Sequence, residues 1–439
     1  MKQQRRSHFS LVILLTGCGL GFGGWLLLRS VDGIRKGQAD EQRRTRTFLP
    51  HEVAPSSAAD SAASPDLSRA LHDALSEQIV RPGAWANEAL LTFSDQASLE
   101  DFVSRAKAAG IVVTGPFSGG TTIRVSFDSL DQLHDALAAI RGDRPAVSAN
   151  FAVSIPDFAV APPDAGGTGT APFGSAMLPS IGIEAGTDRS SWGSGVVVAV
   201  IDSGVSPHPA FREGQVTHVD LTEEGGVFNG HGTAIASLVA GSHEGAEGVA
   251  PGADILDIRI AGVDGVSDSF LLAQGIQTAI KNGAEIINIS MGAYGDAPPV
   301  AAAVAEALSR GITVVSAVGN DGAGVKLWPA ACPGVVSVSG VDADGNLAYF
   351  SNTGSPTLAA PSVGLPSAYQ EGGKALLATG SGTSQATALV SGAAAAFYAR
   401  GINPVPALIE NARPDAARQQ EIGAGILFMP AQGPAPGAK

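Results

Sequence analysis

The sequence VVVAVIDSG at residues 196–204 is the stretch that decides the fold. Its first six residues are apolar and mostly β-branched, which is typical of a strand buried on both faces in a parallel sheet. The strand ends in Asp202, and a charge at the end of a buried strand is costly unless it has a partner. An Asp that only caps the following turn, helped by Gly204, is the simpler interpretation. The stretch therefore predicts a buried strand with a carboxylate at its carboxyl end.

Apolar strands alternate with helices in the region around this stretch. The helices are expected near residues 268–282, 299–310 and 385–399. This alternation predicts an α/β fold with a doubly wound, mostly parallel sheet over residues 181–429. In such sheets, chemistry collects at the carboxyl ends of strands. Asp202 and Asn320 both follow apolar strands, as that rule requires.

Two further motifs carry side chains suited to nucleophilic catalysis. Gly230-His231-Gly232-Thr233 precedes a small apolar helix, and its glycines let other groups approach the imidazole closely. Gly380-Ser381-Gly382-Thr383-Ser384 precedes an Ala-rich helix, so the Ser384 hydroxyl lies at a helix N-terminus, which favours negative charge. Taken singly, a satisfied core histidine and an ordinary serine cap are the simpler interpretations. The three motifs together indicate a serine activated by a histidine.

In this order, the Asp-Ser-Gly of Asp202, the His-Gly-Thr-x-x-Ala of His231 and the Gly-Thr-Ser-x-Ala of Ser384 resemble the signature blocks of the subtilisin-like serine proteases, or subtilases. The resemblance covers roughly residues 190–428. It includes four shorter motifs, Gly248-Val249-Ala250-Pro251, Asn288-Ile289-Ser290-Met291-Gly292, Ala317-Val318-Gly319-Asn320 and Ser351-Asn352-x-Gly354. The resemblance implies a serine endopeptidase that hydrolyses peptide bonds of proteins.

The resemblance also implies a role for each residue. His231 would take the proton of Ser384, and Asp202 would orient the imidazole. The Asn320 side chain and the Ser384 main-chain N–H would bind the oxyanion; an αL turn residue is the alternative interpretation of Asn320. Extended polypeptide substrates would pair with two segments that line the cleft, and broad specificity is expected. The lining residues are Ser290, Met291, Gly292, Ala317, Val318 and Gly319.

Two departures from the family pattern stand out. The family's proline four residues after the nucleophile is Ala388 here, and the intervening methionine is Gln385; neither performs chemistry, so activity is expected to survive. The family's main calcium loop follows the helix of the histidine, where this sequence has only the short interval 242–247. Glu244 and Glu247 fall short of the six to eight oxygens that calcium requires. We therefore expect no cofactor and no metal at that place, while calcium elsewhere stays open.

Residues 85–155 predict a small module with the order βαββαβ, which is that of a ferredoxin-like domain. Ser98 and Ser129 are the expected caps of its two helices. By the resemblance, this module is the inhibitory propeptide of a zymogen and binds the protease of its own chain. Self-cleavage is expected in the linker at 156–180, between about Ser154 and Pro179.

The N-terminus predicts a membrane tether. Basic residues precede an apolar stretch over residues 9–28, which as a helix would span about 30 Å, the thickness of a bilayer core. Residues 1–36 are interpreted as an uncleaved signal anchor with the N-terminus inside. The alternative is a lipoprotein signal, because Leu15-Thr16-Gly17-Cys18 resembles a lipobox in which Cys18 is lipidated. Either interpretation places the catalytic domain in the cell envelope, outside the cytoplasm.

Composition limits the remaining possibilities. The 439 residues carry a formal net charge of −14, although the first fifty hold nine Lys and Arg against three Asp and Glu. An acidic body argues against a nucleic-acid partner. Residues 37–84 and 430–439 are interpreted as a linker and a disordered tail. Cys332 is interpreted as a small buried hydrophobe.

Three functions compete. The first is an active endopeptidase, favoured because Asp202, His231, Ser384 and Asn320 are all retained. The second is a catalytically inactive homologue that acts as a membrane-attached peptide-binding module, which the Ala388 departure motivates. The third is an esterase or amidase of another fold, and the lack of a Gly-x-Ser-x-Gly elbow around the serine counts against it.

Overall fold

The computed structural model describes residues 67–115, 120–140, 144–155, 170–222, 225–226 and 228–430. All of them belong to one unit of the chain, Arg46–Lys439. The expected membrane segment with Cys18, residues 156–169 of the expected processing linker and residues 431–439 of the tail lie outside the described residues. Within the described ranges, no helix has both the length and the apolar character needed to cross a membrane.

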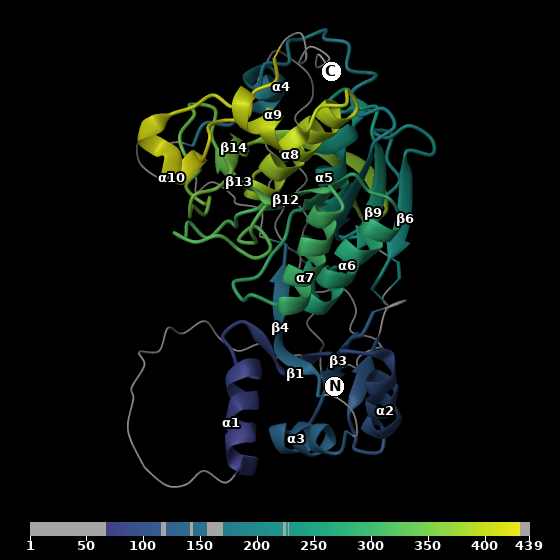
Figure 1. Cartoon of the computed structure of the whole chain (residues 1–439). Coiled ribbons are helices and arrows are strands. Elements are labelled where there is room, and N and C mark those ends of the chain that lie inside the picture. Colours follow the sequence, from purple (N-terminus) through teal and green to yellow (C-terminus); the bar gives the residue numbers. More distant parts are fainter. Residues whose placement is uncertain are drawn as a thin grey trace, which may run out of the picture. The chain divides into compact units, whose positions relative to one another are not determined.

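A seven-stranded sheet forms the centre of the larger part of the molecule (Figure 1). Every pair of neighbouring strands in it is parallel. In spatial order the strands are β14 (Leu358–Pro361), β13 (Val336–Val341), β12 (Thr313–Ala317), β11 (Ile286–Ile289), β5 (Val197–Asp202), β9 (Asp254–Arg259) and β6 (Val216–Asp220). The stretch that decides the fold is β5, an interior strand that pairs with β11 and β9, so the predicted buried strand is confirmed.

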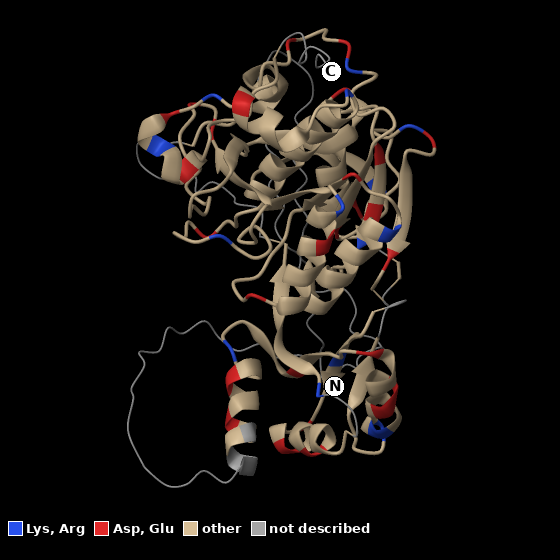
Figure 2. Cartoon of the chain, in the orientation of Figure 1, with Lys and Arg blue, Asp and Glu red and all other residues tan. Residues whose placement is uncertain are grey.

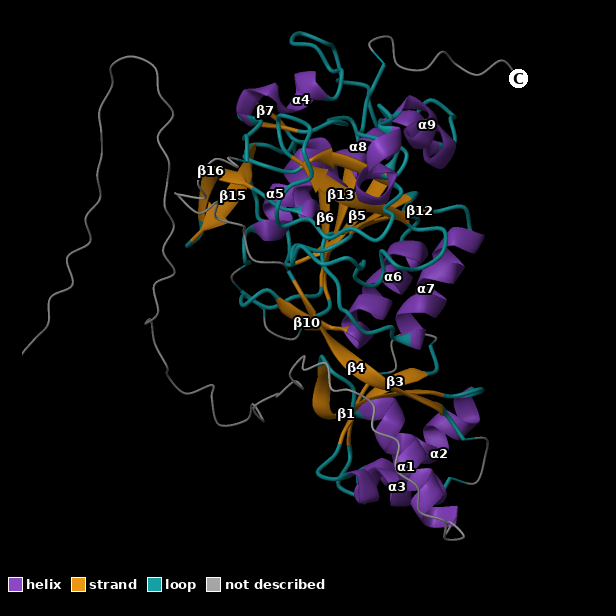
Figure 3. Cartoon of the chain, turned by 90° about the vertical axis from the view of Figure 1, so that its left-hand side faces the viewer, coloured by secondary structure: helices purple, strands orange, loops and turns teal. Residues whose placement is uncertain are grey.

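Helices cover both faces of this sheet (Figure 3). They are α5 (His231–Ala240) and α8 (Thr383–Tyr398) on one face, and α6 (Ser269–Lys281) and α7 (Pro298–Ser309) on the other. Val198 and Val200 of β5 share a core with α5 and α8, whereas Ala199 and Ile201 share a second core with α6 and α7. Alternate residues of one strand face opposite layers. The predicted α/β architecture with a doubly wound, mostly parallel sheet is confirmed.

Helix α8 crosses this part of the molecule almost entirely buried. Its sequence contains no charged residue, and in Figure 2 it is tan, without the blue or red of charged residues. Its small residues let it pack closely against α5 and the sheet, with Ala393 to Ala396 all in the core. The N-terminus of α8 is thereby held at the carboxyl edge of the sheet, next to the residue that follows β11.

Shorter elements complete this part of the chain. They are α4 (Met177–Ser180), β7 (Ser242–His243), β8 (Ala246–Glu247), β10 (Val266–Asp268), β15 (Leu365–Glu371), β16 (Lys374–Gly380), α9 (Pro404–Asn411) and α10 (Gln419–Ile422). Cys332 is buried as predicted, and burial raises the pKa of its thiol to about 11. A thiol in this environment is not a nucleophile.

A small α+β domain precedes this part. Its elements are β1 (Ala84–Thr92), α2 (Gln96–Ala106), β2 (Val112–Thr114), β3 (Thr122–Ser126), α3 (Leu130–Ala138) and β4 (Ala146–Ser154). The strands lie in the order β4-β1-β3-β2 and are antiparallel, which is the ferredoxin-like arrangement. Ser129 caps α3 as expected, but the cap of α2 is Asp95, whose side chain accepts from the N–H of Ser98.

The expected linker at residues 37–84 is wrong in its second half. Residues 67–79 form the helix α1 (Leu67–Ile79), which lies against α3 and β4. The linker interpretation came from residues 38–65, which are charged and then rich in Ala, Ser and Pro. The helix forms nevertheless because Leu75 and Ile79 pack into the core of the small domain. Tertiary contacts outweigh composition at this place.

The small domain contacts the larger part through an added strand. β4 pairs in antiparallel fashion with β10, from Ser154 opposite Val266 to Ala152 opposite Asp268. At the end of this pairing, Arg124 Nη1 lies 2.6 Å from Oδ2 of Asp268, whose side chain is fully buried. Strand β4 thus extends from the small domain to the carboxyl edge of the large sheet.

Candidate active site

Asp202 is the last residue of β5, and its side chain is fully buried. The neighbouring residue holds it in place, because the Ser203 main-chain N–H and hydroxyl donate to Asp202 Oδ1 at 2.7 Å and 3.2 Å. Ser203 Oγ also accepts from the Gly232 N–H at 3.2 Å. The loop after β5 therefore fixes the carboxylate and ties it to the start of α5.

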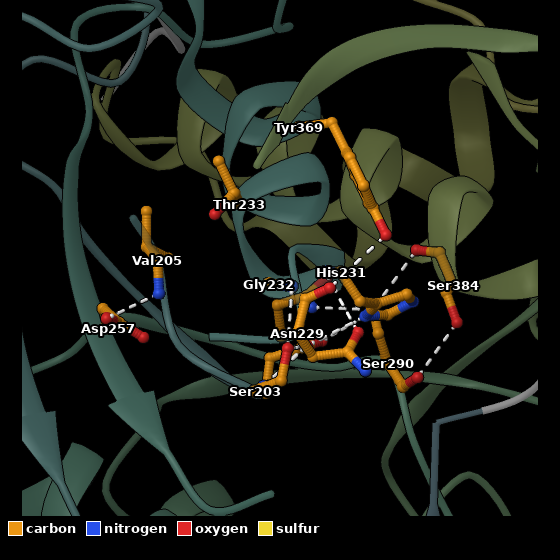
Figure 4. Close-up of polar contacts among 12 residues, drawn as sticks. Ser203, Val205, Asn229, His231, Gly232, Thr233, Asp257, Ser290, Tyr369 and Ser384 are labelled. Atoms are coloured by element: carbon orange, nitrogen blue, oxygen red, sulfur yellow. Dashed lines mark hydrogen bonds and ion pairs between the residues drawn. The ribbon is translucent and has the colours of Figure 1, made fainter. Parts of the chain in front are cut away.

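His231 is the first residue of α5, and its ring lies against Asp202 (Figure 4). Its Nδ1 is 2.8 Å from Oδ1 and 3.0 Å from Oδ2 of that carboxylate. The backbones approach so closely that a Cβ on Gly232 would lie 2.5 Å from the Gly204 carbonyl oxygen. The His231 N–H donates to Asn229 Oδ1 at 3.3 Å, which helps to fix the start of the helix. The two residues have the carboxylate–imidazole geometry of a serine hydrolase.

Ser384 is the second residue of α8, and its side chain is buried. Its hydroxyl donates to the main-chain carbonyl oxygen of Ser290 at 2.9 Å (Figure 4). Ser290 directly follows Ile289, which pairs with Ile201, so Ser384 lies next to the end of β5. In the part of the chain that the structure describes, this is the one hydrogen bond of the Ser384 hydroxyl. The Ser384 hydroxyl thus does not donate to His231, the residue expected to take its proton.

The Asn320 side chain is held through its oxygen. Oδ1 accepts from the Thr383 N–H at 2.9 Å and from the Thr383 hydroxyl at 2.8 Å. The amide nitrogen then faces Gly382, since a Cβ built there would lie 2.9 Å from Asn320 Nδ2. Because these residues immediately precede Ser384, a hydrogen-bond donor lies at the N-terminus of α8. An oxyanion at the serine needs a donor at this place.

The two segments expected to line the substrate cleft follow neighbouring strands. Ser290–Gly292 continues β11, and Ala317–Gly319 continues β12 from its last residue. The Met291 side chain packs into the core shared with α6 and α7, so this residue faces away from a substrate. Gly292 forms an antiparallel bridge with Ser154, whose N–H donates to the Gly292 carbonyl at 3.3 Å. The end of β4 therefore already lies along the first segment.

A second carboxylate near Asp202 was not identified from the sequence. Asp257 on β9 is fully buried, and its Oδ2 accepts from the Val205 N–H at 2.8 Å. The same oxygen lies 2.5 Å from His218 Nδ1. Because Val205 belongs to the loop after Asp202, Asp257 helps to fix that loop (Figure 4). The strand 254–259 reads Asp-Ile-Leu-Asp-Ile-Arg, and with three charged residues in six it gave no sequence signal that singles out Asp257.

The Asp257–His218 pair has shifted proton affinities. The hydrogen bond to Asp257 raises the pKa of His218 above its ordinary value. Burial raises the pKa of Asp257, and the hydrogen bond from His218 works against that rise. Both shifts make the folded chain hold protons more tightly than the unfolded chain. Stability should therefore depend on pH at this pair.

The residues at 242–247 do not form the calcium loop of the family. The interval 242–247 is a tight hairpin of β7 and β8, and Glu244 and Glu247 on it are exposed. Arg189 Nη2 lies 3.7 Å from a carboxylate oxygen of Glu247, so one of the two acids already faces a cation. Among the residues that the structure places, no group of three or more His, Cys, Asp or Glu side chains is arranged to hold a metal ion.

Comparisons with known proteins bear on this site. A model described as the subtilase family matches residues 193–409. Subtilisin Savinase of Lederbergia lenta is 38% identical over 215 residues, which are 47% of this chain and 78% of that protein. Minor extracellular protease Epr of Bacillus subtilis (strain 168) is 36% identical over 256 residues, 55% of this chain. The matched part spans only 39% of the length of Epr.

A solved structure also resembles the chain. It is a mutant of the protease domain of PatA, with 30% identity and a TM-score of 0.49. The match covers 55% of this chain and 94% of that one.

Proposed function

Because this chain belongs to the subtilase family, we propose that it is a serine endopeptidase that hydrolyses peptide bonds of proteins. The observation that supports this most is the buried pair of His231 and Asp202, with 2.8 Å between Nδ1 and Oδ1. Ser384 lies nearby, hydrogen-bonded to the carbonyl of Ser290 at the end of β11. Asp202, His231 and Ser384 are the proposed catalytic triad. The role of each follows from the chemistry of peptide hydrolysis.

The reaction begins with a rotation of the Ser384 hydroxyl. The side chain has to turn about Cα–Cβ into another staggered rotamer, so that Oγ leaves the Ser290 carbonyl and comes within reach of His231. His231 Nε2 then accepts the hydroxyl proton while Nδ1–H keeps its hydrogen bond to the Asp202 carboxylate, and Oγ attacks the carbonyl carbon of the peptide. The imidazolium gives its proton to the leaving amine. Water repeats the sequence on the acyl-enzyme and regenerates the serine.

The oxyanion of each tetrahedral intermediate is stabilised by two donors. They are the Asn320 Nδ2 group and the main-chain N–H of Ser384 at the N-terminus of α8. Because Thr383 already binds the amide oxygen of Asn320, the amide cannot turn over without losing two hydrogen bonds. A donor that is fixed before the reaction needs no reorganisation when charge develops.

The small domain is the proposed inhibitory propeptide of a zymogen. Its strand β4 pairs with β10 and, through Ser154, with Gly292 in the proposed cleft. An extended substrate is expected to pair with the same segment, so this contact supports an inhibitor that occupies the cleft. We expect cleavage between Ser154 and Pro179. Intact mass should reveal this cut in wild-type protein, and the Ser384→Ala chain expressed alone should remain uncut.

The proposed site of action lies outside the cytoplasm, in the cell envelope. The apolar stretch at residues 9–28 supports a membrane tether, formed by a signal anchor or by a lipid on Cys18. One relative is named as an extracellular protease, which agrees with a secreted catalytic domain. Intact mass of the mature protein separates the two tethers, because a lipid adds a defined mass to Cys18.

A second candidate function is that of an inactive, membrane-attached module that binds peptides. The observation that favours it is the Ser384 hydroxyl, which donates to Ser290 rather than to His231. Hydrolysis of an unfolded protein separates the two functions. The processed wild type should cleave it, and Ser384→Ala and His231→Ala should lose roughly 10⁴-fold or more in kcat. If all three proteins lack activity while peptides still bind, the module is the correct function.

A further inference from the structure

The Leu327 side chain fills the space between the two proposed substrate-binding segments. A methyl group placed on Gly292 would lie 2.9 Å from Leu327 Cβ and 3.4 Å from its Cδ1. A methyl group placed on Gly319 would lie 2.9 Å from Leu327 Cγ and 3.0 Å from the same Cδ1. Two glycines on neighbouring segments therefore open toward one another, and one leucine side chain occupies the gap.

Leu327 is held in this position by its backbone. The Leu327 N–H donates to the Val318 carbonyl at 2.9 Å, which ties it to the second segment. The next residue, Trp328, exchanges two hydrogen bonds with Ala293, at 2.8 Å and 3.0 Å, which ties it to the first segment. Leu327 is only 6% exposed. These hydrogen bonds fix the backbone on both sides of the gap, so the Leu327 side chain keeps the gap shallow.

The surroundings of the gap are apolar or already hydrogen-bonded. Val318, Ala293 and Leu327 itself are buried hydrophobic residues. The Asn352 amide nitrogen lies close to Gly319. It already donates to the Val318 carbonyl at 3.2 Å and to the Tyr294 hydroxyl at 3.3 Å. A charged substrate side chain would lose its hydration here without gaining a partner. A small uncharged side chain loses little.

We propose that Leu327 restricts the residue on the amino side of the scissile bond to small, uncharged side chains such as Gly, Ala and Ser. This inference rests on the proposed endopeptidase function. Gly319 lines the gap and directly precedes Asn320, the proposed donor to the scissile carbonyl, so the substrate residue that carries this carbonyl is the one beside the gap. An aromatic or long aliphatic side chain would overlap Leu327. A fixed apolar pocket discriminates by steric exclusion, and one misplaced methylene already changes rates by roughly 10-fold to 200-fold.

The test compares two peptide substrates that differ only in having Ala or Phe before the scissile bond. Processed wild type should have a kcat/KM at least about ten times higher for Ala. Leu327→Gly should raise kcat/KM for Phe by roughly 10-fold or more and so reverse or abolish the preference. Val325→Ala is the matched control, since Val325 lies two residues away and is 54% exposed; it should keep the wild-type ratio.

Two further measurements keep the outcomes separable. Mapping the cleavage sites of wild type in an unfolded protein tests the preference without any variant, and frequent cleavage after Phe, Tyr or Leu overturns the inference. An unchanged Ala-to-Phe ratio in Leu327→Gly that is labelled by a fluorophosphonate to the wild-type extent also overturns it. If wild type is neither labelled nor cleaves either peptide, the proposed endopeptidase function itself is wrong, and the inference falls with it.

Discussion

Ser384 and Ser290, 94 residues apart, form a reciprocal pair of hydrogen bonds. The Ser384 hydroxyl donates to the Ser290 carbonyl at 2.9 Å, and the Ser290 hydroxyl donates to the Ser384 carbonyl at 3.2 Å. The pair joins the N-terminus of α8 to the residue after β11. It also continues inward, because Asn288 donates to Ser290 Oγ at 2.9 Å and accepts from Ser391 at 2.9 Å.

Replacing Ser290 tests this network. Ser290→Ala should lower the free energy of unfolding by about 1–3 kcal/mol, because the buried Asn288 amide loses its acceptor. Denaturant titration measures the change. Ser309→Ala is the control, since that hydroxyl is exposed and bonds only to a carbonyl in its own helix, and its effect should stay below about 0.5 kcal/mol. Equal effects of the two substitutions would contradict a role for the pair.

Asn320→Ala should lower kcat by roughly 10² to 10³ with a much smaller change in KM, because the lost donor acts on the charge of the intermediate. Steady-state kinetics on a peptide substrate measures both constants. Asn282→Ala, at an exposed helix end, should leave them unchanged. A kcat for Asn320→Ala within a few-fold of wild type would exclude this residue from the oxyanion site.

Gly232→Ala should lower kcat by roughly 10²-fold, because a Cβ there meets only backbone atoms of Gly204, the nearest at 2.5 Å. The loop that carries Asp202 must then move away from His231. Gly324→Ala is the matched control, since nothing lies within 4 Å of a Cβ at that position. Wild-type kcat in the Gly232→Ala protein would show that this close approach is not required.

Stability should fall as pH rises through the raised pKa of His218. The hydrogen bond to Asp257 raises that pKa above its unfolded value near 6.5. The stabilisation of the folded chain by protonated His218 is therefore fully present below about pH 6.5 and is lost above the folded pKa. Urea unfolding of the inactive Ser384→Ala chain, with and without His218→Gln, should give a larger difference at about pH 6 than at about pH 9. His243→Gln, in an exposed hairpin, is the control. A difference that grows with pH would contradict the assignment.

Most of the large domain could be predicted because its signals are local. The helices expected near 268–282, 299–310 and 385–399 occur at residues 269–281, 298–309 and 383–398. Apolar periodicity and flanking glycines are read directly from the chain. Helix α1 was missed because the linker composition of residues 38–65 was extended to residue 84, although apolar residues recur every four positions from Leu67 to Ile79. Ser98 was predicted as the cap of α2 in place of Asp95 because both residue types can cap a helix.

The candidate site was predictable only where a motif marks it. Asp202, His231 and Asn320 each lie in a short recognisable motif. Asp202 and Asn320 lie at the carboxyl edge of the sheet, and His231 begins the helix whose N-terminus faces that edge. Asp257 and Leu327 lie in stretches without a motif, and their positions follow from strand pairing and loop contacts. The hydrogen bond from the Ser384 hydroxyl to the Ser290 carbonyl joins residues 94 positions apart, and no sequence pattern encodes it.

Covalent labelling of the processed protein by a fluorophosphonate, with the modified residue located by mass spectrometry, tests the central claim most directly. A serine activated by His231 should carry the label on Ser384, with occupancy close to one per chain, and His231→Ala should prevent labelling. A processed, folded wild-type protein that leaves Ser384 unlabelled would contradict the proposed endopeptidase function.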